Sequence, residues 1–571
     1  MTGTDSTPEP ADIVVLSRRI ITMDPETDPR IEAVAVRGKR ILRLLRRDEI
    51  SAVANEKTRI IDVGDRPVMP GFVDPHAHIE VACRSSFGVV DCRAPQCGTI
   101  DAVVAALSAK AVETPPGEWV VGQANLFFDR KLAEKRFPTR YELDRVSTAH
   151  PVALRAGGHL TILNSKALAV CMIDRNYSPP PYSITGLPSV ERDESGEPTG
   201  IVKEMDNLLP FSAMEREQLA AALQTGIPKL FTQFGVTTIG EISETVDGQQ
   251  IMNDMAARGD LPVSVRTYLW APGTLALEAA CNWKKSISVT APDDLFRIQG
   301  VKLFADGGFS AKSAAVKFPY LVCGCRGGHT FRGEVALDKG FAQRAIELTQ
   351  NAGLQLAVHA NGDRAQEWVC DTLLEMGGAP TGRIRTRIEH AGNLMPSEVT
   401  ADKWAAAGII PVPQPVFLYT FGEYFPDYLG DHGKIGRFSF ATLMKQGWRL
   451  SGSSDVWVGS ESDATNPLFS VWCCLKRQTY SGATLDADEA ITLDQALRLH
   501  TLDAASVLGE DDVRGSIAPG KFADLIVLDR DPHAVAVDEL PKLKVDLVFK
   551  NGKQIWNRTT ATGDGGADAS H

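Results

Sequence analysis

The chain has 571 residues, 43% of them hydrophobic and 23% charged, which is the composition of an ordinary globular protein and excludes wholesale disorder. Its formal net charge is −12, so its surface repels phosphate backbones and we expect no nucleic-acid partner. No apolar run approaches the ~20 residues that span a membrane, and the opening residues lack the basic and apolar segments of a signal peptide. We therefore expect a cytoplasmic protein with no membrane partner.

The chain begins with short predicted strands, and the same pattern returns near its end. Within residues 1–70, β-branched residues alternate with turn signals, and the stretch RILRLLRR at 40–47 is typical of a strand with one solvated face. Residues 505–558 contain similar strands and an Asn-Gly pair typical of a hairpin turn. We expect residues 1–70 and 505–558 to form one composite β-sandwich domain, followed by a disordered tail at 559–571.

Residues 71–504 alternate short apolar strands with helical patterns such as FAQRAIELTQNAG, and this alternation predicts βα units around a parallel sheet. Eight strands are expected, at 70–78, 234–241, 262–270, 297–308, 354–363, 386–393, 408–415 and 448–455. Eight units favour a closed (β/α)8 TIM barrel, so the expected fold class is α/β. The stretch between the first two strands is far longer than a crossover needs, and we interpret residues 80–227 as a subdomain inserted within the barrel.

The sequence His76-Ala77-His78 lies at the end of the first expected barrel strand. Residues two apart on a strand point to the same side, so both imidazoles can reach one ion, and neutral imidazole is a favoured ligand of zinc. Taken alone, such a pair is more often explained by core or solvent-exposed histidines.

Three other residues with metal-binding side chains close later strands. His359, His390 and Asp455 stand at the carboxyl ends of the fifth, sixth and eighth expected strands, where barrel enzymes gather their catalytic groups. Lys302 holds the same place on the fourth strand, but a protonated amine cannot bind a metal, and pairing with Asp306 or a neighbouring carboxylate is the simpler explanation. Four histidines and a carboxylate converging on one face predict a metal site.

The order H-x-H, Lys, His, His, Asp on successive strands resembles the metal-dependent amidohydrolase superfamily. The segments PTGIVKEMD, FGVTTIGE, VKLFADGG, VHANGDRA and RIEHAGN are similar to its YtcJ-like branch, which includes N-substituted formamide deformylases, and SIAPGKFADLIVLD is similar to the superfamily's C-terminal sandwich segment. The resemblance implies a distorted TIM barrel with a composite β-sandwich and a divalent metal, zinc, as one ion or two. The metal-site positions it implies are His76, His78, Lys302, His359, His390 and Asp455.

Two further expectations concern residues around this site. In binuclear members of the superfamily the strand-four lysine is carboxylated, and this would turn Lys302 from a cation into a bridging ligand. Asp74, two residues before His76, would orient the histidines from outside the metal site. Whether one or two ions bind stays open.

The sequence departs from its relatives where the substrate would bind. Relatives often read Asp-Gly-His before an Asn-Ser pair, whereas this chain reads Gly157-Gly158-His159 and then Asn164. His159 and Asn164 are therefore candidate substrate contacts, although a structural loop histidine explains His159 nearly as well. Phe127, Phe128 and Trp457 are candidates for an apolar pocket, and simple packing is the alternative.

The predicted reaction is hydrolysis of a C–N bond, in an amide or N-substituted formamide, by metal-activated water. Asp455 would carry the proton from water to the departing amine, and His390 or His159 would stabilise the oxyanion. A deaminase or cyclic-amide hydrolase on the same fold is the alternative; the acidic residue after His359 is only the distant Asp363, which favours an acyclic amide. A catalytically silent binding protein ranks below both. The expected partner is a small amide-type substrate, and a homo-oligomer stays open.

Overall fold

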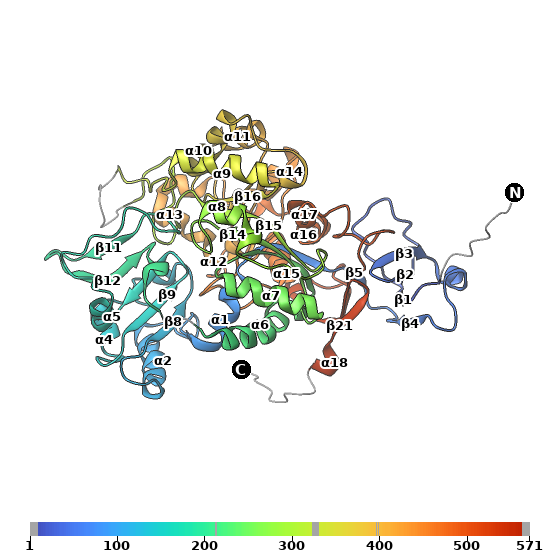
Figure 1. Cartoon of the computed structure of the whole chain (residues 1–571), viewed down its shortest axis with the longest axis horizontal. Coiled ribbons are helices and arrows are strands. Elements are labelled where there is room, and N and C mark those ends of the chain that lie inside the picture. Colours follow the sequence, from blue (N-terminus) through green and yellow to red (C-terminus); the bar gives the residue numbers. More distant parts are fainter. Residues whose placement is uncertain (1–9, 212–213, 322–329, 396, 398, 562–571) are drawn as a thin grey trace.

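The computed structural model describes residues 10–211, 214–321, 330–395, 397 and 399–561. A barrel-like core lies in the middle of the molecule, between a sheet of residues 90–203 on one side and the sheet that contains the N-terminal strands on the other (Figure 1). No helix among the described residues is long and apolar enough to cross a membrane.

A nearly closed parallel sheet forms the core, in the order β18-β17-β16-β15-β14-β13-β6. Its strands are rich in β-branched residues and buried along their whole length, except for one half-buried residue near the start of β15, as expected where helices cover the outside of a parallel sheet. The expected α/β barrel is confirmed to this extent. The seven strands are β6 (Phe72–Ala77), β13 (Val236–Ile242), β14 (Ser264–Trp270), β15 (Phe296–Phe304), β16 (Gln355–His359), β17 (Arg387–Glu389) and β18 (Ile410–Val412).

The eighth expected strand, at 448–455, does not form a regular strand, and this corrects the prediction. The segment SGSS is poor in residues that favour strands, and Asp455 adopts a left-handed backbone with φ 44°, which ends any extended run. The segment nevertheless lies beside β6: the Asp455 amide donates to the His76 carbonyl at 2.9 Å, and the His78 amide donates to the Val456 carbonyl at 3.2 Å. It thus fills most of the gap between β6 and β18.

Helices follow the barrel strands and cover their outer side (Figure 1). In α9 (Lys339–Ala352), Asp338 caps the start by accepting from the Phe341 amide, and Gly353 ends the helix with φ 65°. The other helices of this region are α7 (Val246–Arg258), α8 (Leu277–Cys281), α10 (Asp363–Glu375), α11 (Val399–Ala407), α12 (Val416–Phe421), α13 (Phe425–Leu429), α14 (Phe440–Lys445), α15 (Pro467–Lys476), α16 (Leu493–Leu499) and α17 (Leu502–Val507).

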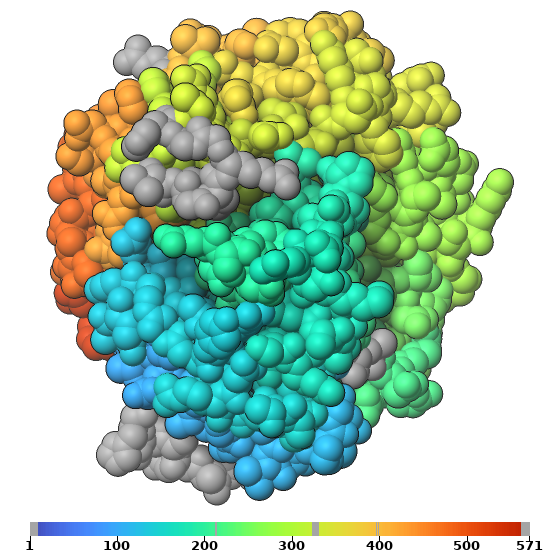
Figure 2. All heavy atoms as spheres, turned by 90° about the vertical axis from the view of Figure 1, so that its left-hand side faces the viewer, coloured from blue at the N-terminus to red at the C-terminus, as the bar shows by residue number. Residues whose placement is uncertain are grey.

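Residues between β6 and β13 form a second, six-stranded sheet in the order β11-β12-β10-β9-β8-β7. Viewed from its side, this part of the chain covers much of the molecule's face (Figure 2). Its strands are β7 (Val90–Asp91), β8 (Val120–Ala124), β9 (Val152–Ala156), β10 (Leu160–Leu163), β11 (Ser189–Arg192) and β12 (Pro198–Lys203), and its helices are α1 (Ile79–Gly88), α2 (Ile100–Glu113), α3 (Phe128–Lys131), α4 (Arg140–Asp144), α5 (Ser165–Val170) and α6 (Arg216–Leu230).

Strands from the two chain ends make two four-stranded sheets, β3-β2-β1-β4 and β21-β20-β19-β5. Val34 of the first sheet and Leu525 of the second belong to one buried apolar cluster, so the sheets share a core. Residues 562–571, which include most of the expected tail, lie outside the described residues. The elements are β1 (Ile13–Leu16), β2 (Ala33–Arg37), β3 (Arg40–Leu45), β4 (Arg59–Asp62), β5 (Val68–Pro70), β19 (Leu525–Leu528), β20 (Val545–Lys550), β21 (Lys553–Asn557) and the short α18 (Arg558–Ala561).

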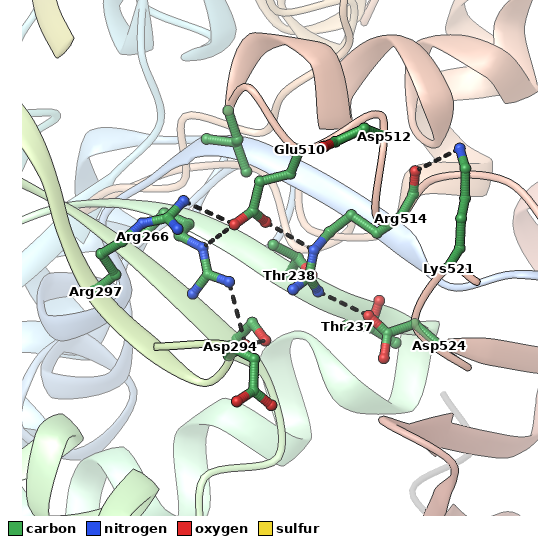
Figure 3. Close-up of polar contacts among 12 residues, drawn as sticks. Thr237, Thr238, Arg266, Asp294, Arg297, Glu510, Asp512, Arg514, Lys521 and Asp524 are labelled. Carbon is green, nitrogen blue, oxygen red and sulfur yellow. Dashed lines mark hydrogen bonds and ion pairs between the residues drawn. The ribbon is translucent and has the colours of Figure 1, made fainter. Parts of the chain in front are cut away.

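A buried ionic network ties the C-terminal segment to the amino ends of the barrel strands (Figure 3). Glu510, which follows α17, pairs with Arg266 of β14 at 2.7 Å, with Arg297 of β15 at 2.8 Å and with Arg514 at 2.7 Å. Arg514 in turn pairs with Asp524 at 2.7 Å, directly before β19. The network therefore joins the barrel to the sheet of the chain ends.

Candidate metal centre

A cavity opens where the carboxyl ends of the barrel strands meet the inserted segment. Six residues predicted as metal-site positions from the sequence line it together, although they come from five separate parts of the chain. They are His76, His78, Lys302, His359, His390 and Asp455.

His76, His78 and Asp455 form the tightest group. One ligand atom from each lies within 4.8 Å of the others, with Nε2 of His76 3.1 Å and Nε2 of His78 3.4 Å from the same Asp455 oxygen. Burial would raise the pKa of Asp455, but the histidines outweigh it and hold that pKa well below its usual value. The carboxylate is therefore ionised.

A carboxylate fixes the orientation of His76. Glu389 of β17 contacts Nδ1 of His76, and Arg387, two residues earlier on the same face, donates to Glu389 at 2.9 Å. Burial would raise the pKa of Glu389, but Arg387 and His76 outweigh it and hold the pKa well below its usual value. Since Glu389 is ionised, Nδ1 of His76 carries the hydrogen, and Nε2 faces the Asp455 oxygen. Burial and Lys302 would lower the pKa of His76, but Glu389 and Asp455 outweigh them and raise it.

His359 and His390 face each other in the same cavity. Nδ1 of His390 lies 2.7 Å from Oε1 of Gln414, an oxygen because Gln414 uses its amide nitrogen to donate to Ser453. Nε2 of His359 lies 3.3 Å from the Gly307 carbonyl. Nδ1 of His390 is thus a donor, and its inner Nε2 presents a lone pair 3.0 Å from Nδ1 of His359. Nε2 of His359 also lies 3.2 Å from the side-chain nitrogen of Asn361.

Both of these imidazoles are neutral. Burial lowers the pKa of His390 to about 3 and, together with the neighbouring His390, lowers the pKa of His359 well below its usual value. Neutral imidazole is the form that binds metals.

Lys302 is fully buried, and its amine has no hydrogen-bond partner among the described residues. Burial lowers its pKa to about 8. The alternative partner considered from the sequence, Asp306, is occupied elsewhere, since its carboxylate accepts the amides of Ala315, Asn361 and Gly362.

His159 reaches the cavity from the inserted segment. Its Nδ1 lies 2.8 Å from Oε2 of Glu204, a fully buried carboxylate that also accepts the Gly308 amide at 3.1 Å. Burial would lower the pKa of His159, but Glu204 outweighs it and raises that pKa. The contact with Glu204 therefore fixes the orientation of the His159 ring on the cavity wall.

The remaining predicted residues divide between the cavity and the surrounding structure. Phe127 and Trp457 line the cavity, and Trp457 packs edge-on against His78 with ring centroids 4.1 Å apart. Phe128 lies in the apolar core of the inserted sheet, and Asn164 caps α5, accepting the Ala167 amide at 2.8 Å. Neither residue is among those lining the cavity.

Asp74 supports the site from behind, accepting the Ser454 amide at 3.1 Å and the His76 amide at 3.3 Å. Three residues with clear positions around the site were not identified from the sequence: Glu389, Glu204 and Gln414. Glu389 immediately precedes His390 on a buried strand, two residues after Arg387. A charged pair on a strand that is expected to be buried is unusual and could have indicated a residue of the site.

The unpaired atoms of this cavity fit a divalent metal ion. Nε2 of His76 and Nζ of Lys302 are buried without hydrogen-bond partners among the described residues, and each such group costs ~1–3 kcal/mol if nothing satisfies it. Ligand atoms of His76, His78 and Asp455 lie within 4.8 Å of one another, and the inner nitrogens of His359 and His390 lie 3.0 Å apart, so each set could hold a cation. Imidazole nitrogens and carboxylate oxygens are the donors that zinc prefers.

Comparison with known proteins agrees with this geometry. The N-substituted formamide deformylase of Arthrobacter pascens is 29% identical over 557 residues, covering 96% of this chain and 99% of the relative. The putative amidohydrolase YtcJ of Bacillus subtilis is 25% identical over 524 residues, covering 88% and 91%. An uncharacterized metal-dependent hydrolase from Pyrococcus horikoshii has the same fold, with a TM-score of 0.69 at 21% identity, over 92% of this chain and 99% of that one.

The family itself follows from a match that spans most of the chain. Residues 59–556 match the model of the amidohydrolase family, a range that contains all six predicted metal-site residues. The resemblance expected from the sequence is confirmed, and the chain belongs to the amidohydrolase family.

Proposed function

We propose that this protein is a metal-dependent hydrolase that cleaves the C–N bond of an amide, specifically an N-substituted formamide. One observation carries the proposal: buried imidazole nitrogens and a carboxylate converge in a single cavity at the carboxyl end of the barrel. The similarity to a formamide deformylase over almost the whole chain supports the choice of bond.

The residues that would hold metal fall into two sets. His76, His78 and Asp455 form one, and His359 with His390 the other, and we assign zinc to them, as one ion or two. A divalent ion bound there would lower the pKa of its water to ~7 and act as a Lewis acid on the carbonyl oxygen.

Lys302 joins the site as a carbamate in this proposal. Its neutral amine forms an N–C bond to carbon dioxide and releases one proton, which leaves an anionic group with two oxygens in place of a cation. Burial favours this step, because it lowers the pKa of Lys302 to about 8 and so increases the fraction of neutral amine.

Asp455 and His159 move and hold protons. The ionised Asp455 oxygen accepts a proton from the attacking water and passes it to the nitrogen of the departing amine. His159, fixed through Nδ1 by Glu204, keeps a proton at Nε2 and donates it as a hydrogen bond to the carbonyl oxygen while negative charge develops there. Trp270, Phe304 and Phe127 exclude water from the reacting group.

The test combines metal content with product analysis. Purified protein is loaded with zinc, its metal-to-chain ratio is measured by elemental analysis, and formate release from a panel of N-substituted formamides is followed, with cyclic amides and aminopurines alongside. We expect formate release that stops on chelation and returns with zinc. Ring opening or ammonia release without formate would replace the proposal with a cyclic-amide hydrolase or a deaminase, and full activity without metal would overturn it.

A further inference from the structure

A second cavity adjoins the catalytic one on the side of the inserted segment. It lies between α1, the start of the inserted sheet and the chain after β12, and we call it the outer pocket. Its lining shares four residues with the catalytic cavity: Gly158, Thr185, Trp270 and Trp457. The two cavities are therefore neighbours across a common wall.

The sizes of the two cavities differ. The catalytic cavity holds about 80 Å³ and the outer pocket about 460 Å³. An engineered cavity of roughly 150 Å³ is known to bind benzene, so the catalytic cavity has room for the scissile group and little more. Any sizeable substituent of the substrate must lie outside it.

The charges around the outer pocket are mostly paired within the protein. Arg155 donates to Asp206 at 2.8 Å, whereas Oε1 of Glu244, 3.5 Å from Nδ1 of His78, has no hydrogen-bond partner among the described residues. Apolar side chains share the wall with polar ones such as Ser85, Glu118 and Asn207. Trp119 and Phe211 pack edge-on at 5.1 Å between ring centroids. The other apolar lining residues are Val81, Val89, Val121, Ile184, Leu209 and Met214. An uncharged, apolar group suits this part of the lining.

Trp457 forms the partition between the cavities. Its indole packs against His78 on the catalytic side, and a Cβ atom at Gly158 would lie only 3.0 Å from Nε1 of Trp457. The glycine thus leaves room for the indole, and Nε1 is buried with no hydrogen-bond partner among the described residues. A substrate passing this point would meet one apolar ring and one unpaired donor.

We propose that the outer pocket binds the N-substituent of the substrate amide, and that the preferred substrates are formamides with a long, uncharged, apolar N-substituent that extends past Trp457. This inference rests on the proposed function: a formamide has only hydrogen on its acyl side, so its bulk lies beyond the nitrogen.

Gly88 provides a sharp test, because it lines only the outer pocket and not the catalytic cavity, and a Cβ atom there would meet nothing within 4 Å. We compare the zinc-loaded wild type with Gly88→Leu on three substrates: N-methyl-, N-butyl- and N-(4-phenylbutyl)formamide. The control is Gly340→Leu, because Gly340 is an exposed residue of α9 outside both cavities. We expect Gly88→Leu to lower kcat/KM for the longest substrate by about tenfold or more and to leave N-methylformamide unchanged. Trp119→Ala should raise KM for the longest substrate in the same selective way.

Binding without turnover separates this inference from the proposed reaction. Calorimetry measures N-(4-phenylbutyl)formamide binding to zinc-loaded Asp455→Asn, with and without Gly88→Leu. Weaker binding in the double variant supports the assignment of the outer pocket to the N-substituent. If the wild type nevertheless releases no formate, the proposed reaction fails and the pocket assignment stands. Equal binding to the single and double variants, or an equal effect of Gly88→Leu on all three formamides, would overturn the inference.

Discussion

The Glu389 carboxylate contacts Nδ1 of His76 while Arg387 holds the same carboxylate from its own strand. His76 and Glu389 lie far apart in the sequence, and closure of the barrel brings them together. Through this contact a residue that touches no ligand atom decides which nitrogen of His76 faces the metal site.

Replacing Glu389 with Gln should weaken zinc binding by about 10–100-fold, because the neutral amide holds His76 less firmly. Competition with a chromophoric chelator measures the affinity. Glu367→Gln is the control, since Glu367 is also a buried carboxylate but pairs with Lys317 at 2.5 Å, away from the cavity. Equal affinities in the two variants would contradict the role of Glu389.

Asp455→Asn should lower kcat by about a thousandfold or more while the protein stays folded. Asn tolerates the left-handed backbone at this position, where φ is 44°, so the substitution removes the charge and the proton acceptor without straining the chain. Initial rates and the thermal unfolding midpoint are measured together, with Asp463→Asn as a control in the same loop. Near-normal turnover would show that another group moves the proton.

Lys302→Met should lower the number of zinc ions bound per chain, since it removes the carbamate while keeping an apolar side chain of similar length. Elemental analysis gives the ratio. In parallel, ¹³C NMR after incubation with labelled bicarbonate should show a carbamate carbon in the wild type and none in the variant. An unchanged zinc ratio and a wild type without this signal would rule out a carbamate at Lys302.

Glu510→Gln should lower the free energy of unfolding by about 3–5 kcal/mol, because it leaves the buried Arg266 and Arg514 and the half-buried Arg297 without their shared counter-charge. Urea unfolding followed by tryptophan fluorescence measures the change. Glu539→Gln, at an exposed pair with Lys542, should have little effect. Similar losses in both variants would mean that the network contributes no more than a surface pair.

The same carboxylate predicts a pH dependence. Burial would raise the pKa of Glu510, but Arg266 and Arg514 outweigh it and lower the pKa to about 2, against about 4.3 in the unfolded chain. The stabilisation is therefore complete above about pH 4.3 and disappears as the pH falls toward 2. The unfolding free energy of the wild type should fall more steeply over this range than that of Glu510→Gln, and parallel curves would contradict the assignment.

Residues at the ends of strands could be predicted because their positions follow from local pattern. The H-x-H spacing and the strand ends at His359 and His390 depend only on the periodicity of a strand and on parallel packing. A buried Arg387–Glu389 pair could be suspected from the sequence, but the contact of Glu389 with His76 could not, because the two residues meet only when the sheet curves round. The sequence neighbours of Asn164 predict a substrate contact, whereas its side-chain oxygen caps the start of a helix. A short polar residue before a helical run is also typical of such a cap. The eighth strand failed for a local reason, the Ser- and Gly-rich segment before Asp455.

The pairing of β5 with β19 has a consequence for the order of events during synthesis. Pro70 pairs with Leu525, and the Gly71 amide donates to the Asp524 carbonyl at 2.9 Å, immediately before the strand that carries His76. The ribosome completes that partner strand hundreds of residues after β5 has emerged. Until then β6 is held by its pairing with β13 but lacks the contact that fixes its amino end. We therefore expect a C-terminally truncated chain to hold its first two histidines less firmly and to bind metal more weakly than the full-length chain.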